Sequence, residues 1–411
     1  MTLYEDLVWR GLIQDISSDD LKDKLNAGGL TFYIGTDPTA NSLHIGHYSS
    51  FLITKRLANA GHTPIILVGG ATGLIGDPRG TSERELSVED TVRANFEGLK
   101  AQIQSVFGFE VVNNLDWIKG LDVITFLRNY GKYFGVGYML GKDLVRRQLE
   151  TTGISYAEFS YMILQALDFK HLHQTRGVAL QVAGSDQWGN ITSGIELVRK
   201  TTGDEVYGMT MPLVTDAQGQ KFGKSVGNPI WIDRAKTSSY ELYQFLINSA
   251  DSKVIDYLKR LTFLTREEIE EIERQHLAQP EKRLAQTALA RAVVSDLHGA
   301  DAFAEAENIS RKLFSGDIKG ISTSDLNVGL SNVPHFVLTF GTLLDVLIAS
   351  QICKSKREAR ELLAAGAVSV NGDIVKDGEF AVDESILLDG RMVVIRRGKK
   401  AYYVGVVEGA R

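Results

Sequence analysis

Residues 30–47 read LTFYIGTDPTANSLHIGH, and the pattern of this stretch indicates the fold class. Its first six residues form an apolar run typical of a buried strand, and a turn-rich segment follows them. A helix is expected to begin near Ser42, because serine is a favoured N-cap residue. A strand that passes directly into a helix is the repeating unit of a parallel α/β sheet.

The same alternation continues along the first half of the chain. Further strands are expected at residues 63–70, 109–114, 178–184 and 205–214, with helical spacing between them. This order predicts an α/β fold, a doubly wound, Rossmann-like parallel sheet with helices on both faces. Ligands of such sheets bind at the carboxyl ends of the strands, at the point where the strand order reverses.

The chain is expected to divide into four parts. The Rossmann-like domain is assigned to residues 1–232, and a separate all-helical domain to residues 233–320. Residues 321–341 have few helical cues and are expected to form a linker. Residues 342–411 combine two helices with short strands, which predicts a small α+β module. Its strands are expected at residues 368–372, 386–390, 391–398 and 401–407.

Composition restricts the class of protein. The 411 residues exceed one ordinary domain, and the hydrophobic content of 44% is typical of a globular chain. Cys353 is the only cysteine, so neither an intrachain disulfide nor a multi-thiolate metal site is expected. The N-terminus lacks a secretory pattern, and no apolar run approaches the roughly 20 residues that span a bilayer. A cytoplasmic protein without membrane contact is expected.

His44 and His47 lie at the expected start of the first helix of the sheet, with Gly46 between them. They could be zinc ligands, ordinary helix residues or part of a phosphate site. Zinc needs three or four ligands, and neither an HExxH pattern nor a cysteine pair completes a set. A helix N-terminus that follows a strand attracts anions, and Gly46 would let a nucleotide approach the backbone closely.

A second motif, KFGKS at residues 221–225, follows the last expected strand of the sheet. Two lysines and a serine could bind a triphosphate, although such a loop alone is more often a solvated surface. Its combination with HIGH at the first strand–helix junction favours the phosphate site.

HIGH and KFGKS together resemble the paired motifs of the class I aminoacyl-tRNA synthetases. Further stretches resemble the bacterial tyrosyl-tRNA synthetases, namely YIGTDPT (33–39), SYMILQALD (160–168) and QVAGSDQWGNI (181–191). SKREARELLAAGAVSVNG (355–372) resembles the small RNA-binding domain first named for ribosomal protein S-four. The resemblance implies a ligase that activates L-tyrosine with ATP and transfers it to the 3′ adenosine of tyrosine tRNA.

The resemblance also implies a tyrosine pocket. Tyr161, Gln165 and Asp168 share one face of a helix by their spacing, which would equally suit an amphipathic surface. The residues expected to bind tyrosine are Tyr33, Asp77, Tyr161, Gln165, Asp168 and Gln181. A phenol bonded by both Tyr33 and Asp168 would strongly reject phenylalanine, a discrimination for which tyrosyl-tRNA synthetases are themselves the known case.

Nucleotide and catalytic residues follow from the same resemblance. The residues expected to bind ATP are Gly35, Asp37, Thr39, Gly46, Gly184, Asp186, Gln187 and Lys224. The residues expected to be catalytic are His44, His47, Lys221, Lys224, Ser225 and Arg84. Many relatives carry a lysine shortly after the GDP turn at residues 76–78, whereas this chain has arginines there, and Arg79 could replace that lysine. Mg²⁺ is expected only as part of the ATP substrate complex, with no metal site of the protein.

The expected partners beyond tyrosine and ATP are tyrosine tRNA and a second copy of the chain. The predicted tRNA contacts are Lys354, Lys356, Arg357, Arg360, Arg396, Arg397, Lys399 and Lys400, although these could form a solvated charged face. The resemblance suggests a homodimer through residues 115–158. Three other classes stay open: a tryptophanyl-tRNA synthetase, a small-molecule nucleotidyltransferase with an HxGH motif, and a non-catalytic RNA-binding protein built on a synthetase.

Overall fold

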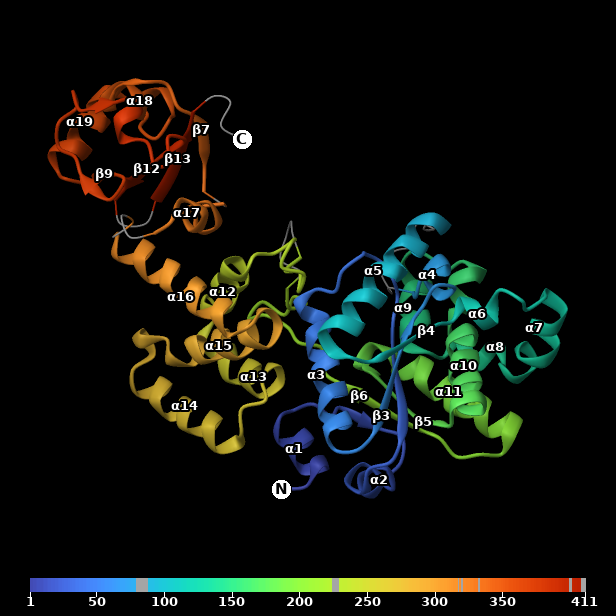
Figure 1. Ribbon diagram of the computed structural model, residues 1–411. Coiled ribbons are helices and arrows are strands. Elements are labelled where there is room, and N and C mark those ends of the chain that lie inside the picture. The colour runs from blue at the N-terminus through green and yellow to red at the C-terminus, as the bar shows by residue number, and fades with distance from the viewer. Residues whose placement is uncertain are drawn as a thin grey trace. The chain divides into compact units, whose positions relative to one another are not determined.

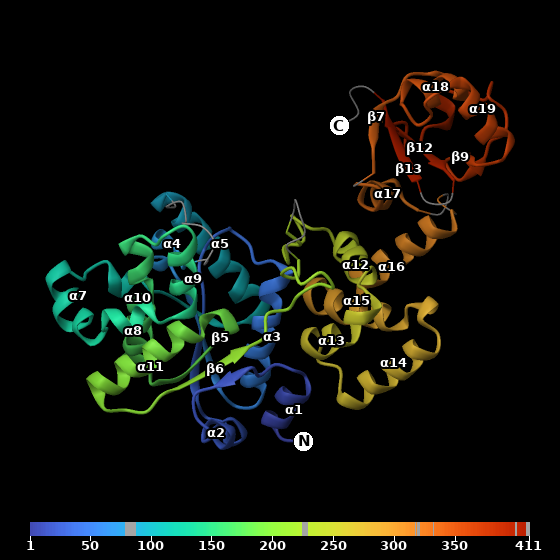
Figure 2. The same cartoon turned by 180° about the vertical axis from the view of Figure 1, so that it is seen from behind.

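The computed structural model describes residues 1–78, 88–223, 229–316, 318, 321–331, 333–398 and 401–407. The chain divides into two compact units. The first comprises Met1–Thr237 and Ser249–Val293, and the second comprises Ser238–Asn248 and Val294–Arg411. Figures 1 and 2 show the elements of each unit from opposite sides.

The first unit is built on a six-stranded sheet with the order β1-β6-β5-β2-β3-β4. Neighbouring strands are parallel, except that β1 pairs antiparallel with β6. The chain runs from β2 through β3 to β4 and then returns to β5 on the other side of β2, so the order reverses between β2 and β5. The predicted Rossmann-like fold is confirmed. The strands are β1 (Asp15–Ile16), β2 (Thr31–Thr36), β3 (Thr63–Val68), β4 (Glu110–Asn113), β5 (Val178–Gly184) and β6 (Tyr207–Met211).

Helices cover both faces of this sheet (Figures 1 and 2). Helices α3 (Ile45–Asn59) and α5 (Glu89–Phe107) contact β3, while α10 (Tyr156–Arg176) and α11 (Trp188–Thr202) contact β5. Cover on both faces explains why consecutive residues of β2 are buried. The unit also contains α1 (Leu3–Trp9), α2 (Leu21–Ala27), α4 (Thr72–Ile75), α6 (Leu115–Ile118), α7 (Val123–Asn129), α8 (Val136–Leu140), α9 (Asp143–Thr151), α13 (Asp251–Leu261) and α14 (Arg266–Ala278).

Helix α3 begins later than expected. Its first residue is Ile45 and its N-cap is His44, so the prediction that Ser42 caps the helix is wrong. Ser42 is buried, and its hydroxyl donates to Leu43 O at 3.1 Å. The side chain of His44 takes the capping role instead, since its Nδ1 accepts from Gly46 N at 3.0 Å.

The second unit joins α12 (Ser239–Ile247), α16 (Ala300–Ser315) and α17 (Thr323–Gly329) to a sheet with the order β10-β9-β12-β13-β7. Alternate side chains of β12 (Met392–Arg397) enter two different cores. Val394 packs with residues of α16 and α17, whereas Val393 packs with residues of α18 (Leu343–Ala349) and α19 (Lys356–Ala364). The remaining strands are β7 (His335–Val337), β8 (Gly341–Thr342), β9 (Val368–Val370), β10 (Asp373–Ile374), β11 (Ala381–Val382) and β13 (Ala401–Val406), and α15 (Leu284–His298) contributes to both units.

Two stretches of the second unit differ from expectation. The strand expected at residues 386–390 is wrong: a 3-10 turn, Glu384–Ile386, leads into it, because the carboxylate of Asp383 accepts from Ser385 N at 2.9 Å. The stretch 321–341, expected to be a linker, contains α17 and β7, and Leu326 and Leu330 are buried in the core beside α16. The domain boundaries themselves stay predictions.

Candidate active site

A cavity of about 310 Å³ lies at the carboxyl ends of β2 and β5. It therefore occupies the point where the strand order reverses, as expected for a ligand site of this sheet. The predicted site residues that line it are Tyr33, Gly35, Asp37, Thr39, His44, Gly46, His47, Asp77, Tyr161, Gln165, Asp168, Gln181, Gly184, Asp186, Gln187 and Lys221. The roles assigned to them stay predictions. Arg79, Arg84, Lys224 and Ser225 lie outside the described residues.

The two histidines form a stacked pair at the N-terminus of α3. Their ring centroids are 3.9 Å apart, with an interplanar angle of 28°. His44 Nδ1 accepts from Gly46 N, and His47 Nδ1 accepts from His44 N at 3.3 Å. In a neutral ring these bonds place the proton on Nε2, which makes each imidazole a donor. No group of three His, Cys, Asp or Glu side chains that could hold a metal occurs in the described part of the chain.

Asp168 forms the polar end of a buried pocket between α10 and β2. Its two carboxylate oxygens accept from Trp117 Nε1 at 2.8 Å and from Asn114 Nδ2 at 3.0 Å. Burial raises the pKa of Asp168 to about 7, against the opposing effect of these two hydrogen bonds. The two hydrogen bonds thus hold the carboxyl group in a fixed position. Because its pKa is about 7, its ionised and protonated forms are similarly populated at neutral pH.

Three polar atoms that face this cavity have no hydrogen-bond partner among the described residues: Tyr33 Oη, Gln165 Oε1 and Gln181 Oε1. A buried polar atom without a partner costs free energy, roughly 1–3 kcal/mol. Three such atoms in residues that line the same cavity as Asp168 are therefore suited to a ligand that brings a hydroxyl and other polar groups. Burial also raises the pKa of the Tyr33 phenol, so its hydroxyl stays a donor.

Two further carboxylate groups, Asp37 and Asp77, line the same cavity. Asp77 accepts from Gln187 Nε2 at 2.7 Å and from Asn190 Nδ2 at 3.2 Å, and burial raises its pKa to about 7. Asp37 accepts from the Tyr161 hydroxyl at 3.0 Å. Since these carboxylates lie in one low-dielectric site, a cationic group of a ligand would be attracted there.

Another side of the cavity joins the end of β5 to Lys221 and Phe222 of the KFGKS motif. Lys221 Nζ lies 3.4 Å from Asp186 Oδ2, so the first lysine of the motif reaches the carboxylate at the start of the turn after β5. Gly46 is packed closely by the protein itself, because a side chain there would come within 3.0 Å of Phe222 O. The structure thus brings HIGH close to Lys221–Gly223, the described start of the KFGKS motif, although 174 positions separate His47 from Lys221.

Several positioning residues were not anticipated from the sequence. Asn114 links Asp168 to Thr72, which in turn donates to Asp37 Oδ1 at 2.8 Å. Trp117 and Asn190 each donate to a site carboxylate. Asn114 could have been suspected, since it follows the carboxyl end of β4, but nothing in its spacing indicates which carboxylate it would bind.

In the second unit, the predicted tRNA contacts separate into two groups. Lys354, Lys356, Arg357 and Arg360 are exposed on or beside α19. Arg396 and Arg397 of β12 are only partly exposed. Arg397 donates to Glu358 Oε1 at 2.7 Å and to Ile352 O at 2.6 Å. In the exposed group, Lys356 is paired with Asp345 and Arg357 with Glu361. Lys399 and Lys400 lie outside the described residues. Across the described residues of the whole chain, every helix is too short or too polar to cross a lipid bilayer.

Two family models match the chain. Residues 25–315 match the model of class I tRNA synthetases (W and Y), and residues 325–405 match that of the tyrosine–tRNA ligase SYY-like C-terminal domain. The chain therefore belongs to the class I tRNA synthetases, the class whose paired motifs HIGH and KFGKS resemble.

Full-length relatives identify the particular family. The chain is 49% identical over 416 residues to the tyrosine–tRNA ligase of Geobacillus stearothermophilus, covering 98% of this chain and 99% of the relative. It is 48% identical over 413 residues to that of Staphylococcus carnosus, covering 98% of each. A solved C-terminally truncated mitochondrial tyrosyl-tRNA synthetase of Coccidioides posadasii is similar with a TM-score of 0.65 and 32% identity, covering 75% of this chain and 91% of that one. The chain belongs to the tyrosine–tRNA ligase family.

Proposed function

We propose that this member of the tyrosine–tRNA ligase family couples tyrosine to tRNA in two steps within the described cavity. First, a carboxylate oxygen of tyrosine attacks the α-phosphorus of ATP. The bond from that phosphorus to the bridging oxygen breaks, and pyrophosphate leaves with its Mg²⁺, which enters as part of the substrate complex. Then a ribose hydroxyl of the 3′ adenosine of tRNA attacks the tyrosyl carbonyl carbon, and AMP leaves.

The protein contributes position and charge rather than a covalent group. In the proposal, Asp168 and Tyr33 bind the phenol, while Asp77, Tyr161 and Gln165 face the ammonium group. The remaining pocket contact is Gln181. Asp186 would bind the ribose of ATP, with Gly35, Asp37, Thr39, Gly184 and Gln187 around the adenylate. His44, His47 and Lys221 would donate to the phosphate oxygens as their charge grows, together with Lys224, Ser225 and Arg84.

One observation carries the proposal: a single cavity is lined by the carboxylate of Asp168, by the Tyr33 hydroxyl, which has no hydrogen-bond partner among the described residues, and by residues of HIGH and the start of KFGKS. The test is aminoacylation of unfractionated bacterial tRNA with labelled tyrosine, phenylalanine or tryptophan. We expect charging with tyrosine alone. Charging with tryptophan would favour the related synthetase class, and adenylate formation without charging would favour a small-molecule nucleotidyltransferase. ATP and tRNA as substrates support a cytoplasmic location.

Tyrosine affinity is expected to depend on pH near neutrality. Asp168 and Asp77 have pKa values of about 7 in the free protein, and bound tyrosine would favour the carboxylate form of both through its hydroxyl and ammonium groups. The dissociation constant should therefore rise as pH falls through 7, by at least roughly tenfold between about pH 8 and about pH 6. Equilibrium dialysis across this range measures it. A flat profile would contradict the proposed contacts, and a flattened profile in Asp168→Asn would assign the effect to Asp168.

The exposed basic residues on and beside α19 are proposed to contact the tRNA backbone. The double variant Lys354→Glu with Arg360→Glu should weaken tRNA binding, and the slope of log K against log salt should fall by about 2 if both contact phosphate. Tyrosine-dependent pyrophosphate exchange should be unchanged. The matched control reverses two other exposed charges of the module, Lys376→Glu with Arg391→Glu. Equal losses in the two double variants would mean that only the net charge matters.

We also propose a homodimer through residues 115–158. In this range Val123, Ile124, Val136 and Tyr156 are more than half exposed, and exposed large apolar residues in one region often mark an interface. Ile124→Asp is expected to convert the dimer to a monomer in sedimentation experiments, because it buries an unpaired charge. Leu277→Asp, at a more exposed position of α14, is the control and should leave the dimer intact. A wild-type monomer would contradict the proposal.

A further inference from the structure

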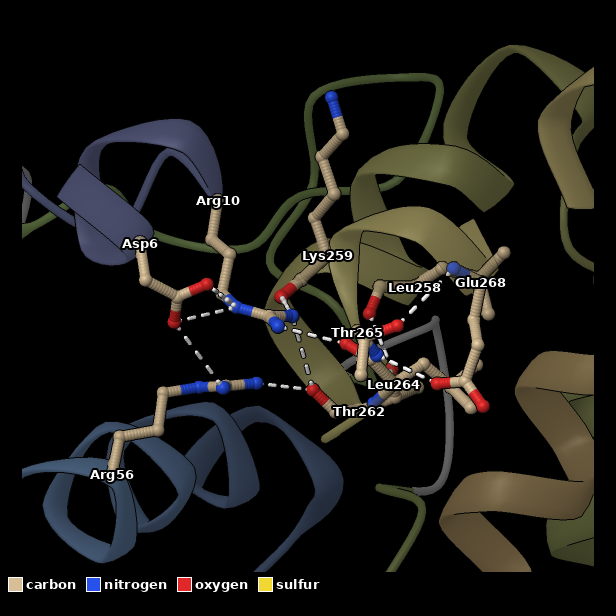
Figure 3. A network of polar contacts seen from close by, with 9 residues as sticks. All are labelled: Asp6, Arg10, Arg56, Leu258, Lys259, Thr262, Leu264, Thr265 and Glu268. Carbon is tan, nitrogen blue, oxygen red and sulfur yellow. Dashed lines mark hydrogen bonds and ion pairs between the residues drawn. The ribbon is translucent and has the colours of Figure 1, made fainter. Parts of the chain in front are cut away.

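Two arginines and one aspartate form a buried network that connects α1 and α3 with the end of α13 (Figure 3). Arg10 Nε lies 2.9 Å from both carboxylate oxygens of Asp6, and Arg56 Nη1 lies 3.7 Å from the same carboxylate. The two arginines are only 4% and 7% exposed. Buried charges are retained at low cost only when they are paired and hydrogen-bonded, so this network fixes α1 against α3.

The guanidinium groups also bind backbone carbonyls at the end of α13 and in the short connection that follows it. Arg10 donates from Nη1 to Lys259 O at 3.0 Å and from Nη2 to Leu264 O at 2.7 Å. Arg56 donates from Nη2 to Thr262 O. The last carbonyls of a helix lack intrahelical partners and carry the negative end of its dipole, so cations are favoured there. The end of α13 is thereby attached to α3, the helix that begins with the two site histidines.

The middle of α13 contacts the KFGKS segment. The ring centroid of Tyr257 lies 4.5 Å from that of Phe222, the second residue of the motif. The hydroxyl of Tyr257 donates to Thr215 O at 3.0 Å, and Thr215 in turn pairs with Lys221 in an antiparallel bridge. Tyr257 is buried. Helix α13 thus contacts Phe222, which follows Lys221 in the chain, and Thr215, which pairs with Lys221 across the bridge.

Lys221–Gly223, the described part of the KFGKS motif, pack closely against α3. Gly223 adopts a positive φ of 75°, and a side chain at this position would clash with Ile45. On the other side, Ile45 N donates to Ile230 O at 2.8 Å, and Ile230 N donates to Gly223 O at 3.2 Å. The described start of the motif thus contacts α3 on one side and α13 on the other, so both helices determine where Lys221 lies relative to the histidines.

We infer that α13 is a positioning brace for ATP activation, in which Tyr257 holds Lys221 through Phe222 and Thr215. The Asp6–Arg10–Arg56 network fixes the far end of the brace to α3. Tyr257 and Arg56 are therefore positioning residues, and neither lines the cavity. The inference rests on the proposed function, because it assigns a role in the same phosphate-binding step.

The test uses two variants of the full chain that differ in the contact they remove. Tyr257→Phe removes the bond to Thr215 O and keeps the ring against Phe222. Arg56→Met removes a bond to the end of α13 and leaves the Asp6–Arg10 pair balanced in charge, so it is expected to fold. The control is Tyr207→Phe, which removes another buried hydroxyl of the first unit that donates to Glu205 Oε2 at 2.7 Å.

The measurements are kcat and the ATP KM of tyrosine-dependent pyrophosphate exchange, together with the tyrosine dissociation constant. Both variants should lower kcat by roughly threefold to tenfold, the factor that corresponds to one hydrogen bond, while tyrosine affinity changes by less than about twofold. The control should behave like the wild type. Wild-type kcat in both variants would overturn the inference, as would a loss shared by the control or an equal loss of tyrosine affinity. Exchange absent from the wild type would instead contradict the proposed function.

Discussion

Replacing His44 with alanine is expected to lower the rate of tyrosine-dependent ATP–pyrophosphate exchange roughly 10²-fold, the usual effect of removing one donor to a developing negative charge. The affinity for tyrosine should change by less than about twofold, because an interaction made mainly in the transition state contributes little to ground-state binding. The structural reason is the tautomer of the ring. His44 Nδ1 accepts from Gly46 N, so Nε2 is the nitrogen that donates.

The same side chain caps α3, and a second variant separates the two roles. Asparagine is a favoured N-cap residue, so His44→Asn should keep an acceptor for Gly46 N and preserve thermal stability better than alanine. We expect it to restore stability without restoring the exchange rate. If the rate recovers together with stability, or if His44→Ala weakens tyrosine binding as much as it slows exchange, the donor role is wrong.

Replacing Asp168 with alanine is expected to raise the tyrosine dissociation constant by roughly 10- to 100-fold. A hydrogen bond to a charged group contributes about 1.5–3 kcal/mol, and the change would also leave the Trp117 and Asn114 donors without their carboxylate. Phenylalanine lacks the hydroxyl that Asp168 is proposed to accept from. Its affinity should therefore change much less, and the preference for tyrosine should fall.

Phenylalanine binding is the internal control for this variant, and Tyr33→Phe is the external one. Tyr33 Oη has no partner among the described residues, so its removal leaves no protein donor or acceptor unsatisfied. Tyr33→Phe should keep full stability, and its preference for tyrosine over phenylalanine should fall less than that of Asp168→Ala. Equal weakening of tyrosine and phenylalanine in Asp168→Ala would show a general loss of the pocket and would contradict the phenol contact.

The sheet was predictable because its strands are long apolar runs bounded by turn residues. Short strands and edge strands could not be predicted. Strand β1 has only two residues, and it is a strand because it pairs with β6 rather than because of its own sequence pattern. The same holds for α17, where Leu326 and the following Leu330 are buried because α16, β12 and β13 provide a partner face. The local sequence pattern predicts a helix or strand when the periodicity of that segment alone indicates which residues are buried. The pattern fails when burial depends on a segment that is distant in the sequence.

The site divides in the same way. The motif residues could be placed at one edge of the sheet because parallel strands end at the same edge. Their hydrogen bonds could not be predicted: the Tyr161–Asp37 bond spans 124 positions, and Asn114 and Trp117 reach Asp168 from a separate segment. The start of α3 also depended on such detail, because Ser42 is held by contacts with Leu43 and Gln102.

The most direct test is the initial rate of ATP–pyrophosphate exchange by the intact chain with tyrosine, phenylalanine or tryptophan as the sole amino acid. This measurement isolates the activation step from tRNA binding and depends on both ends of the cavity at once. We expect rapid exchange with tyrosine and little with the other two. Exchange with tryptophan in place of tyrosine, equal rates with all three, or no exchange at all would contradict the assignment of this cavity to tyrosine activation.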